Sequence, residues 1–356
     1  MDADDKGLEK PLQRFYLPLL AAKLGAIPRH PLIFSKGSTS HMNIGQQMQQ
    51  LYQQFGELPG ITIELHRDLL AISITNDRAD ATVFLQGAQL SHFQPKDQQH
   101  PVIWCSPDCE YKSGQSLRGG IPVCWPWFGD ASRNPEPVQQ LIGSEPAPAH
   151  GIARNQLWNL DNIEIINTGH TRLTLSLNVE NEPLWPQHCQ LQLTMEISQQ
   201  LELRWKVSNL SQQALAFSGA LHSYFAINNT QQLTVTGLEA LPFIDCMDQW
   251  QTKTEPAAVC IDQEIDRIYQ GTNNKTISLV DTGWQRVINI TSQGSNSAVL
   301  WNPWIEKAKR LSQFPDDAYQ SMLCLETANA AEDFVTLDAG DTHQLTLTIS
   351  IDPLSH

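Results

Sequence analysis

The clearest signal in this 356-residue chain is a strict alternation of apolar and polar residues. Side chains along a β-strand point alternately to opposite faces of a sheet, so an alternating segment predicts a strand with one buried face. The alternation is unbroken in LTLSLNV (173–179), LQLTMEI (191–197), LELRWKV (201–207) and LTLTISI (345–351). It is weaker in ITIEL (61–65), LAISIT (70–75), ATVFLQ (81–86), LTVTGL (233–238), TISLV (276–280) and VINIT (287–291). Turn-forming stretches such as NDRAD, NNTQQ and GTNNK separate these segments.

Strand follows strand with no helical period in between, which favours antiparallel sheets over βαβ units. We therefore predict an all-β fold, a large antiparallel β-sandwich with few short helices. No Pro/Gly/Ser-rich linker divides residues 43–356, so this stretch is expected to be a single domain. The helices are predicted at 43–55 and 304–313. The Pro-rich segment 130–151 is predicted to be a long loop, and long loops in compact domains are commonly functional.

The first 42 residues differ from everything that follows. They contain an apolar patch and then a loose Gly/Ser/Thr segment that ends in GSTSHM. They lack the basic start and continuous apolar run of a secretory signal. We interpret residues 1–42 as an appended tag or a leader, poorly ordered, with Met42 as the natural start. A native leader containing an amphipathic helix is the alternative.

The charge balance narrows the classes of partner. The chain carries 23 Lys and Arg against 38 Asp and Glu, a net charge of −15. Nucleic-acid binding needs a positive face, so no nucleic-acid partner is expected. No apolar run approaches the roughly 18 to 20 residues that span a bilayer, so no membrane association is expected. An anionic substrate must then be met by a few local cations that act against the overall field.

The seven cysteines are odd in number and scattered, which does not resemble a secreted disulfide framework. We expect free thiols in a reducing compartment, the cytoplasm, and a monomeric protein. Cys105 and Cys109 are four residues apart, but no second Cys or His pair follows at zinc-site spacing. No metal is predicted.

One stretch is unusual for a soluble protein: SLRGGIPVCWPWFG, residues 116–129. Its two prolines exclude a strand interior, and prolines and glycines together exclude a helix. The stretch therefore predicts a shaped loop that places large flat rings beside the single cation Arg118. Trp/Pro clusters are more often packing than ligand surfaces, so this loop alone does not assign a function.

Four further stretches carry side chains capable of chemistry. AHGIARNQLW contains His150 and Arg154, GALHSYFAI contains His222, QEIDRIYQG contains Asp266, and MLCLETANA is a buried-looking strand that ends in Glu326. Each also has a plainer interpretation. A histidine on an apolar strand is more often a core residue, an Asp beside an Arg is usually a surface ion pair, and a Glu after a strand can mark where that strand meets water.

Taken together, these motifs resemble a known family. RGGIPVCWPWFG, HGIARN, LHSYF, EIDRIY, WNPW and ETANA occur in order across residues 118–330. The set is similar to the glucose-6-phosphate 1-epimerases, the D-hexose-6-phosphate mutarotases of the galactose-mutarotase-like superfamily. The resemblance covers nearly everything after residue 60. It implies a large antiparallel β-sandwich (supersandwich), in agreement with the alternation described above.

The resemblance implies interconversion of the α and β anomers of an aldohexose 6-phosphate, with glucose 6-phosphate expected first. A base takes the proton of the C1 hydroxyl and an acid protonates the ring oxygen, so that the ring opens and closes again on the other face. By resemblance Glu326 is the base and His222 is the acid, and both groups are able to titrate near neutral pH. No cofactor is implied, and the sequence contains no P-loop or dinucleotide fingerprint.

Substrate-binding roles follow from the same resemblance. Asp266 matches a position that binds sugar hydroxyls, and Arg118 offers a planar fork of donors for a phosphate or a hydroxyl pair. The glycines after Arg118 are expected to let the backbone come close to the ligand. Trp127 is expected to wall the pocket together with its aromatic neighbours. His150 and Arg154 are further pocket candidates, Arg154 as the second cation.

One departure affects the phosphate. The family is expected to place another cation near LQGAQLSHF, where this chain has Gln89 and His92. Lys112 or Gln115 is then the expected substitute. Two other functions stay open: an aldose 1-epimerase for unphosphorylated sugars, and a non-catalytic carbohydrate-binding sandwich. The second would not need both His222 and Glu326.

Overall fold

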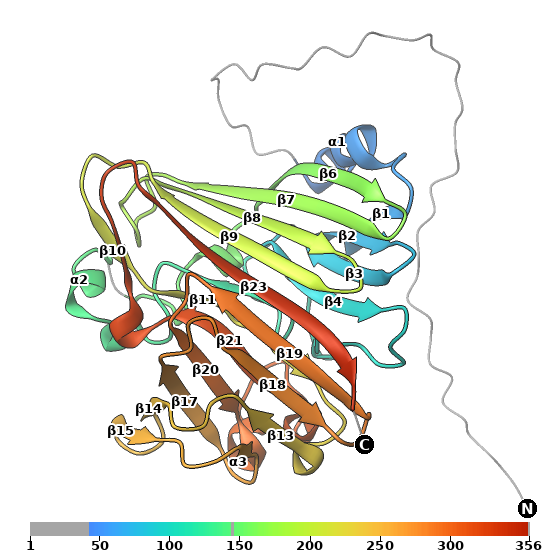
Figure 1. The fold of residues 1–356 in the computed structure, drawn as a ribbon. Coiled ribbons are helices and arrows are strands. Elements are labelled where there is room, and N and C mark those ends of the chain that lie inside the picture. Colours follow the sequence, from blue (N-terminus) through green and yellow to red (C-terminus); the bar gives the residue numbers. More distant parts are fainter. Residues whose placement is uncertain (1–42, 144–145, 355–356) are drawn as a thin grey trace, which may run out of the picture. The chain divides into compact units, whose positions relative to one another are not determined.

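A nine-stranded antiparallel sheet forms one layer of the molecule, and it contains all four segments with unbroken alternation (Figure 1). The computed structural model describes residues 43–143 and 146–354, so the predicted leader lies outside the described residues. In β7 the burial pattern alternates along the strand, as the sequence predicts. In spatial order the strands are β16 (Val259–Cys260), β13 (Leu233–Thr236), β18 (Thr276–Asp281), β19 (Arg286–Gln293), β23 (Thr342–Pro353), β9 (Leu201–Asn209), β8 (Cys189–Ile197), β7 (His170–Val179) and β6 (Asn159–Asn167).

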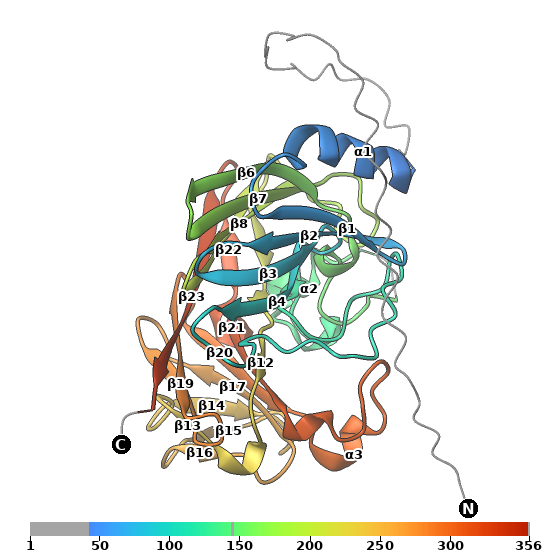
Figure 2. The ribbon, with the colours of Figure 1, turned by 90° about the vertical axis from the view of Figure 1, so that its right-hand side faces the viewer.

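The opposite layer consists of two further sheets (Figure 2). The four-stranded sheet contains β1 (Ile61–His66), β2 (Leu69–Thr75), β3 (Ala79–Phe84) and β4 (Gln89–Pro95) in that order. The eight-stranded sheet contains β15 (Gln251–Thr254), β14 (Pro242–Asp245), β17 (Ile265–Gln270), β20 (Ser297–Asn302), β21 (Met322–Asn329), β11 (Gly219–Leu221) and β5 (Val123–Cys124), with β12 (Tyr224–Ala226) also paired to β21. A two-stranded sheet joins β10 (Leu215–Phe217) and β22 (Val335–Leu337).

Every pair of named strands in the described residues is antiparallel. The predicted all-β sandwich is therefore confirmed. The main hydrophobic core collects inner-face residues from the nine-stranded sheet, such as Leu193 and Trp205, and from the opposite layer, such as Ile72 and Leu325. Stacking two such faces removes both apolar surfaces from water, which is the dominant favourable term in folding.

The helices are short and peripheral. The α-helices are α1 (Ile44–Phe55), α2 (Glu136–Gln139) and α3 (Trp304–Ala308), and the 3-10 turns are η1 (Ala131–Arg133), η2 (Ala153–Asn155), η3 (Thr230–Gln232), η4 (Ala318–Gln320) and η5 (Ala331–Asp333). A capping box begins α1, because the side chains of Asn43 and Gln46 each accept from the other's backbone N–H. No helix in the described residues is long and apolar enough to cross a membrane.

The second predicted helix, 304–313, is too long. The α-helix ends at Ala308, and the N–H groups of Arg310 and Leu311 bond only three residues back. Gln313 then takes a positive φ of 55°, which the interior of a right-handed helix does not accommodate.

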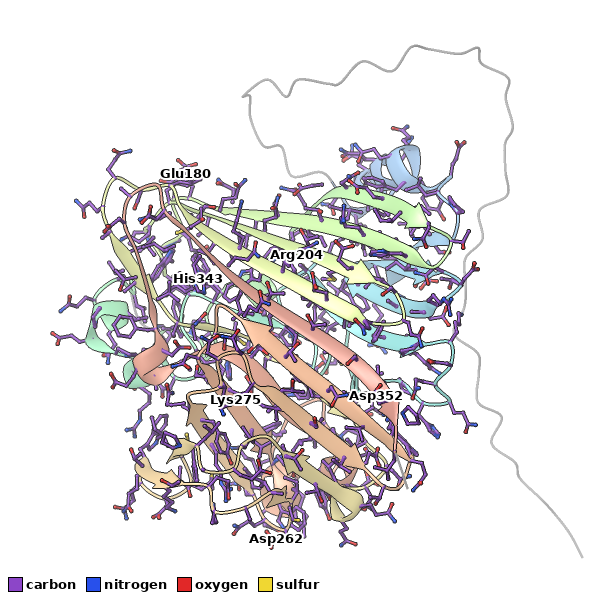
Figure 3. All side chains as sticks on the ribbon, viewed as in Figure 1. Glu180, Arg204, Asp262, Lys275, His343 and Asp352 are labelled. Atoms are coloured by element: carbon purple, nitrogen blue, oxygen red, sulfur yellow. The ribbon has the colours of Figure 1, made fainter. Side chains whose placement is uncertain are left out.

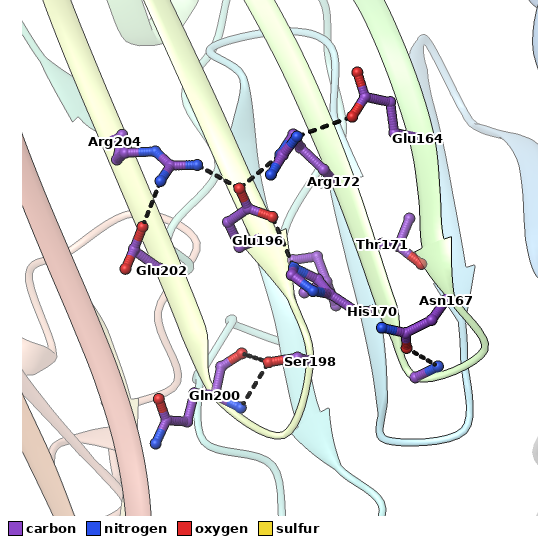
Figure 4. Close-up of polar contacts among 12 residues, drawn as sticks. Glu164, Asn167, His170, Thr171, Arg172, Glu196, Ser198, Gln200, Glu202 and Arg204 are labelled. Carbon is purple, nitrogen blue, oxygen red and sulfur yellow. Dashed lines mark hydrogen bonds and ion pairs between the residues drawn. The ribbon is translucent and has the colours of Figure 1, made fainter.

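A charged cluster lies on the outer face of the nine-stranded sheet, around Arg204 of β9 (Figure 3). The Glu196 carboxylate accepts from Arg172 Nε at 2.6 Å, contacts His170 Nε2 at 2.7 Å and also accepts from Arg204 (Figure 4). We call Glu196, His170, Arg172 and Arg204 the outer cluster. Opposite charges on neighbouring strands are a usual way for a sheet to present a solvent face.

Candidate active site

His222 lies in a short interruption between two strands that both pair with β21. Leu221 of β11 is opposite Thr327, and Tyr224 of β12 is opposite Cys324. The sequence suggests that His222 lies on a strand, whereas the structure places it between β11 and β12. The His222 N–H donates to the Pro122 carbonyl at 3.0 Å, and the Ser223 N–H donates back to the Leu221 carbonyl at 3.0 Å. This local turn breaks the ladder at His222.

Glu326 is fully buried in the interior of β21, opposite Val299 of β20. The sequence predicts that the strand ends at Glu326. That prediction is wrong, because Thr327 still pairs with both Leu221 and Ala298. Residues directly opposite each other in adjacent strands share a face of the sheet. Glu326 therefore shares its face with Val299, away from the main core, and that face is the wall of the candidate site.

The turn brings the His222 imidazole onto the Glu326 carboxyl group, with Nε2 and Oε1 3.3 Å apart. Within the described residues, His222 Nδ1 and Glu326 Oε2 are buried and have no hydrogen-bond partner. Buried polar atoms are normally paired, and one left unpaired is costly unless a ligand completes it. The two residues predicted to act together therefore lie in one site, and each keeps a free polar atom.

Burial sets the protonation of this pair. It raises the pKa of the Glu326 carboxyl group well above its ordinary value, and the nearby Asp266 carboxylate raises it further. Burial also lowers the pKa of His222 well below its ordinary value, and the nearby His150, Arg154 and Arg118 lower it further. Both shifts disfavour the charged forms. The pair is thereby poised to hold one proton between a carboxyl group and an imidazole, which is the state able both to give and to take a proton.

Two aromatic residues hold the imidazole, and the sequence interpretation assigned a role to neither. Tyr224 stacks on His222 with ring centroids 4.8 Å apart and 7° between the planes. Trp301 meets the His222 ring edge-on at 6.4 Å. Both residues lie in quoted motifs, LHSYF and WNPW. The signal was available for Tyr224, because residues two apart on an extended segment share a face.

Asp266 lies on β17, two strands from Glu326, and is opposite Trp301. Burial raises the pKa of its carboxyl group, an effect that Lys307 opposes. Lys307 Nζ is 4.0 Å from Asp266 Oδ2 and lies over the Trp301 ring at 5.8 Å. Cross-strand register places Asp266 on the same face as Glu326, as its predicted role requires.

His150 and Arg154 come from the long loop and reach the same site. The His150 ring is 5.1 Å from the Phe128 ring and 5.3 Å from the His222 ring, and its Nδ1 accepts from the Gly129 N–H at 3.3 Å. Burial, with Arg154 and Arg118, lowers the pKa of His150 to about 3, so the ring is neutral. Arg154 lies in η2 and donates from Nη2 to the Ala149 carbonyl at 2.7 Å. Its buried Nε has no partner among the described residues.

Arg118 is half-buried. The charge of its guanidinium group opposes the rise in the pKa of Tyr224 that burial causes, and it lowers the pKa of His222. Gly119 and Gly120 follow with φ of 116° and 70°. A Cβ at Gly119 would lie 2.5 Å from Cys105 Cα, and one at Gly120 would lie 2.4 Å from the Leu90 carbonyl oxygen. The glycines thus bring backbone close to backbone and fix the position of Arg118.

Three residues that the sequence offers for substrate binding contact other parts of the protein instead of the His222–Glu326 pair. Trp127 is fully buried in the main core and donates from Nε1 to the Pro148 carbonyl at 2.7 Å, so it holds the loop and offers no open ring face. Gln115 is exposed, and its carbonyl accepts from Gln86. Lys112, the other expected substitute, is ion-paired with Glu110 at 2.5 Å.

Gln89, where a cation was expected, has a structural role. Its Nε2 donates to the Gly119 carbonyl at 2.6 Å and to the Leu117 carbonyl at 3.3 Å. It therefore fixes the backbone on either side of Arg118. In the described residues, no group of three or more His, Cys, Asp or Glu is arranged to hold a metal ion.

Comparisons with known proteins identify a family for this chain. A family model described as aldose 1-epimerase matches residues 71–350. Proteins named "Putative glucose-6-phosphate 1-epimerase" are similar: one from Cenchrus ciliaris is 29% identical over 78% of this chain and 82% of its own length. One from Escherichia coli (strain K12) is 30% identical over 74% of this chain and 85% of its own length. A solved structure, "a putative mutarotase" from Salmonella typhimurium, is 26% identical with a TM-score of 0.75, covering 83% of this chain and 95% of that one.

Proposed function

This chain belongs to the aldose 1-epimerase family, and on that premise we propose that it interconverts the α and β anomers of glucose 6-phosphate, with His222 and Glu326 as the proton-transfer groups. The family chemistry is anomer exchange at C1 of an aldose. The substrate and the residue roles are the proposed part.

In the proposed mechanism the proton that the pair shares first passes from Glu326 to His222 across their 3.3 Å contact, and Glu326 then accepts the proton of the C1 hydroxyl while His222 protonates the ring oxygen. The bond between C1 and the ring oxygen breaks and leaves the open-chain aldehyde. Rotation about the C1–C2 bond presents the other face of the carbonyl to the C5 hydroxyl. As the ring closes, His222 takes the proton of the C5 hydroxyl and Glu326 gives its proton to the former carbonyl oxygen, so the enzyme is unchanged after each turnover.

The observation that carries the proposal is the His222–Glu326 contact, with one free polar atom on each residue. A sugar hydroxyl is able to complete the hydrogen bonding of Glu326 Oε2, which nothing else in the described residues does. A simple carbohydrate-binding sandwich would have no reason to keep a buried acid in contact with a buried imidazole. The third function left open by the sequence is therefore not favoured.

Arg118 and Arg154 support a phosphorylated substrate. Both act on His222 and lower its pKa, which shows that positive charge surrounds the imidazole. In a chain of net charge −15, two arginines whose charges act on one imidazole are a local exception to the overall field. A bound phosphate would neutralise that field and raise the pKa of His222, and so strengthen its role as the acid.

The test compares two sugars that differ only in the phosphate. Anomer exchange by NMR should be far faster on glucose 6-phosphate than on glucose at equal concentration. Glucose 6-phosphate should also raise the melting temperature more, because a ligand that binds only the native state stabilises it. Equal rates on both sugars would favour the second candidate, an epimerase of unphosphorylated aldoses, which the Gln89 position supports.

We also propose that the protein works as a monomer in the cytoplasm and without nucleic acid. All seven cysteines are free, which suits a reducing compartment. The acidic net charge disfavours nucleic acid. Sedimentation or size-exclusion measurements at micromolar concentration test the oligomeric state.

A further inference from the structure

Two cysteine thiols face each other directly behind the Arg118 loop. Cys105 Sγ and Cys109 Sγ are 3.9 Å apart. A short turn joins them, with the Cys109 N–H donating to the Ser106 carbonyl at 3.3 Å. A disulfide needs a sulfur–sulfur distance of about 2.05 Å, so only a modest closure of this turn separates the thiols from a covalent bond.

Both thiols also hold the backbone of Arg118. Cys109 Sγ is 3.4 Å and Cys105 Sγ is 3.7 Å from the Arg118 carbonyl oxygen, which accepts from the Ser106 N–H as well. Cys105 forms a β-bridge with Gly119, the glycine that admits no Cβ on that side. Any movement of Cys105 is therefore transmitted to the residues that position the Arg118 guanidinium group.

Cys109 differs in its pKa, and Cys105 in its access, from the buried cysteines Cys124 and Cys189. The hydrogen bond from the Cys105 thiol lowers the pKa of Cys109, whereas burial raises the pKa of Cys124 to about 12 and that of Cys189 to about 11. Cys105 lines a surface cavity of about 330 Å³, together with Ser91, His92 and Tyr111. A water-sized oxidant occupies roughly a tenth of that volume and so reaches Cys105, whose sulfur is 3.9 Å from that of Cys109.

We propose that Cys105 and Cys109 are a peroxide-sensitive modification site, and that their disulfide weakens substrate binding by displacing Arg118. Oxidation removes both S–H donors from the Arg118 carbonyl, and closure of the turn pulls Cys105 away from Gly119. The disulfide itself is independent of the enzyme's activity. Its effect on catalysis rests on the function proposed above.

The reaction balances with a hydroperoxide as oxidant. The Cys109 thiolate attacks one peroxide oxygen, the O–O bond breaks, and Cys109 becomes a sulfenic acid while hydroxide leaves. The Cys105 sulfur then attacks the sulfenic sulfur, the S–O bond breaks, and the Cys105 proton leaves with that hydroxyl as water. Two thiols lose two electrons in total, and hydrogen peroxide is reduced to two waters.

The experiment treats the reduced full-length chain with hydrogen peroxide and reads mass and activity together. A mass loss of about 2 Da, with a cross-linked 105–109 peptide, is expected first. The kcat/KM for glucose 6-phosphate should fall roughly three- to tenfold, a fraction of the value of a charged hydrogen bond, and dithiothreitol should restore it. Cys105→Ser and Cys109→Ala should each abolish the sensitivity, whereas the matched control Cys260→Ser, at an exposed cysteine of β16, should keep it.

Two outcomes overturn the proposal. One is oxidation that adds oxygen at Cys260 or elsewhere while residues 105–109 never cross-link. The other is a cross-linked enzyme whose kcat/KM matches that of the reduced enzyme, which removes the connection to Arg118. If the reduced protein exchanges no anomers at all, the proposed function has failed instead, and the cross-linked peptide still reports on the thiol pair by itself.

Discussion

Two of the histidine–glutamate pairs in the described residues have opposite surroundings. On the outer face, Glu196 is 2.7 Å from His170 and also bonds Arg172 and Arg204, so its carboxylate is fully partnered. In the candidate site, Glu326 is 3.3 Å from His222, and its second oxygen has no partner among the described residues. The side chain of Glu196 is 11% exposed and that of Glu326 is 2% exposed.

The pKa values of the two carboxyl groups move in opposite directions as a result. Burial acts to raise the pKa of Glu196, but Arg172 and His170 outweigh it and the net shift is downward. Nothing offsets the burial of Glu326, and its pKa rises. A partnered carboxylate stabilises a surface, whereas an unpartnered buried acid costs stability and persists where it has a function. The predictions below use Glu196 and its neighbours as internal controls.

The largest difference should appear in catalysis. Glu326→Gln and His222→Asn should each lower kcat for anomer exchange by about 10²- to 10⁴-fold, the usual value of a positioned proton-transfer group. Glu196→Gln should leave kcat unchanged. Two-dimensional NMR exchange on glucose 6-phosphate measures all three, and circular dichroism confirms that each variant is folded. Wild-type exchange by Glu326→Gln would falsify the assignment of the pair.

The two single losses should not multiply. Residues that act as one unit are strongly non-additive, because removing either one already disables the shared step. The double variant Glu326→Gln/His222→Asn should therefore lose less kcat than the product of the single losses. A full product would mean that the two groups act in separate steps, contrary to their 3.3 Å contact.

A smaller effect is expected at the arginines. Arg118→Lys keeps the charge but loses the planar fork, so kcat/KM for glucose 6-phosphate should fall roughly 5- to 150-fold. This corresponds to a loss of about 1 to 3 kcal/mol in transition-state stabilisation. Arg172→Lys in the outer cluster is the matched change and should leave kcat/KM as it is. The contrast is tested by steady-state kinetics on both sugars, and an equal loss on glucose would deny Arg118 a phosphate role.

How well the sequence predicts a strand of this fold depends on whether one or both faces of that strand are buried. Strands β7, β8, β9 and β23 have one face in the core and one toward water, so their alternation predicts them directly. Strand β21 is buried at every residue, and a run of that kind carries no period that would mark where it ends. The sequence therefore offered Glu326 as a candidate but placed it at the end of the strand, whereas it lies in the interior.

The site shows the same limit. The motifs predicted that His222, Glu326, Asp266, His150 and Arg154 belong together. The sheet register places Asp266 and Glu326 on one face, the His150 ring contacts the His222 ring, and the charge of Arg154 lowers the pKa of His222. The motifs did not predict that Trp127 is fully buried, because the sequence around a tryptophan beside an arginine is the same whether the ring is open to a ligand or buried. Only the packing of the loop against the core distinguishes the two.

The smallest effect concerns stability, and it should have opposite signs at the two glutamates. The lowered pKa of Glu196 means that its contribution is present above the ordinary glutamate value of about 4.3 and is lost as the pH falls through the folded-state pKa. The raised pKa of Glu326 means that its contribution is complete below that ordinary value and is lost as the pH rises through the folded-state pKa. Glu326→Gln should therefore melt at a higher temperature than the wild type near pH 8, with the difference shrinking as the pH falls toward about 5. Glu196→Gln should melt at a lower temperature near neutral pH, with the difference shrinking only in stronger acid. Thermal unfolding across this range checks both, and melting shifts of the same sign would mean that the unpartnered oxygen of Glu326 costs the fold nothing.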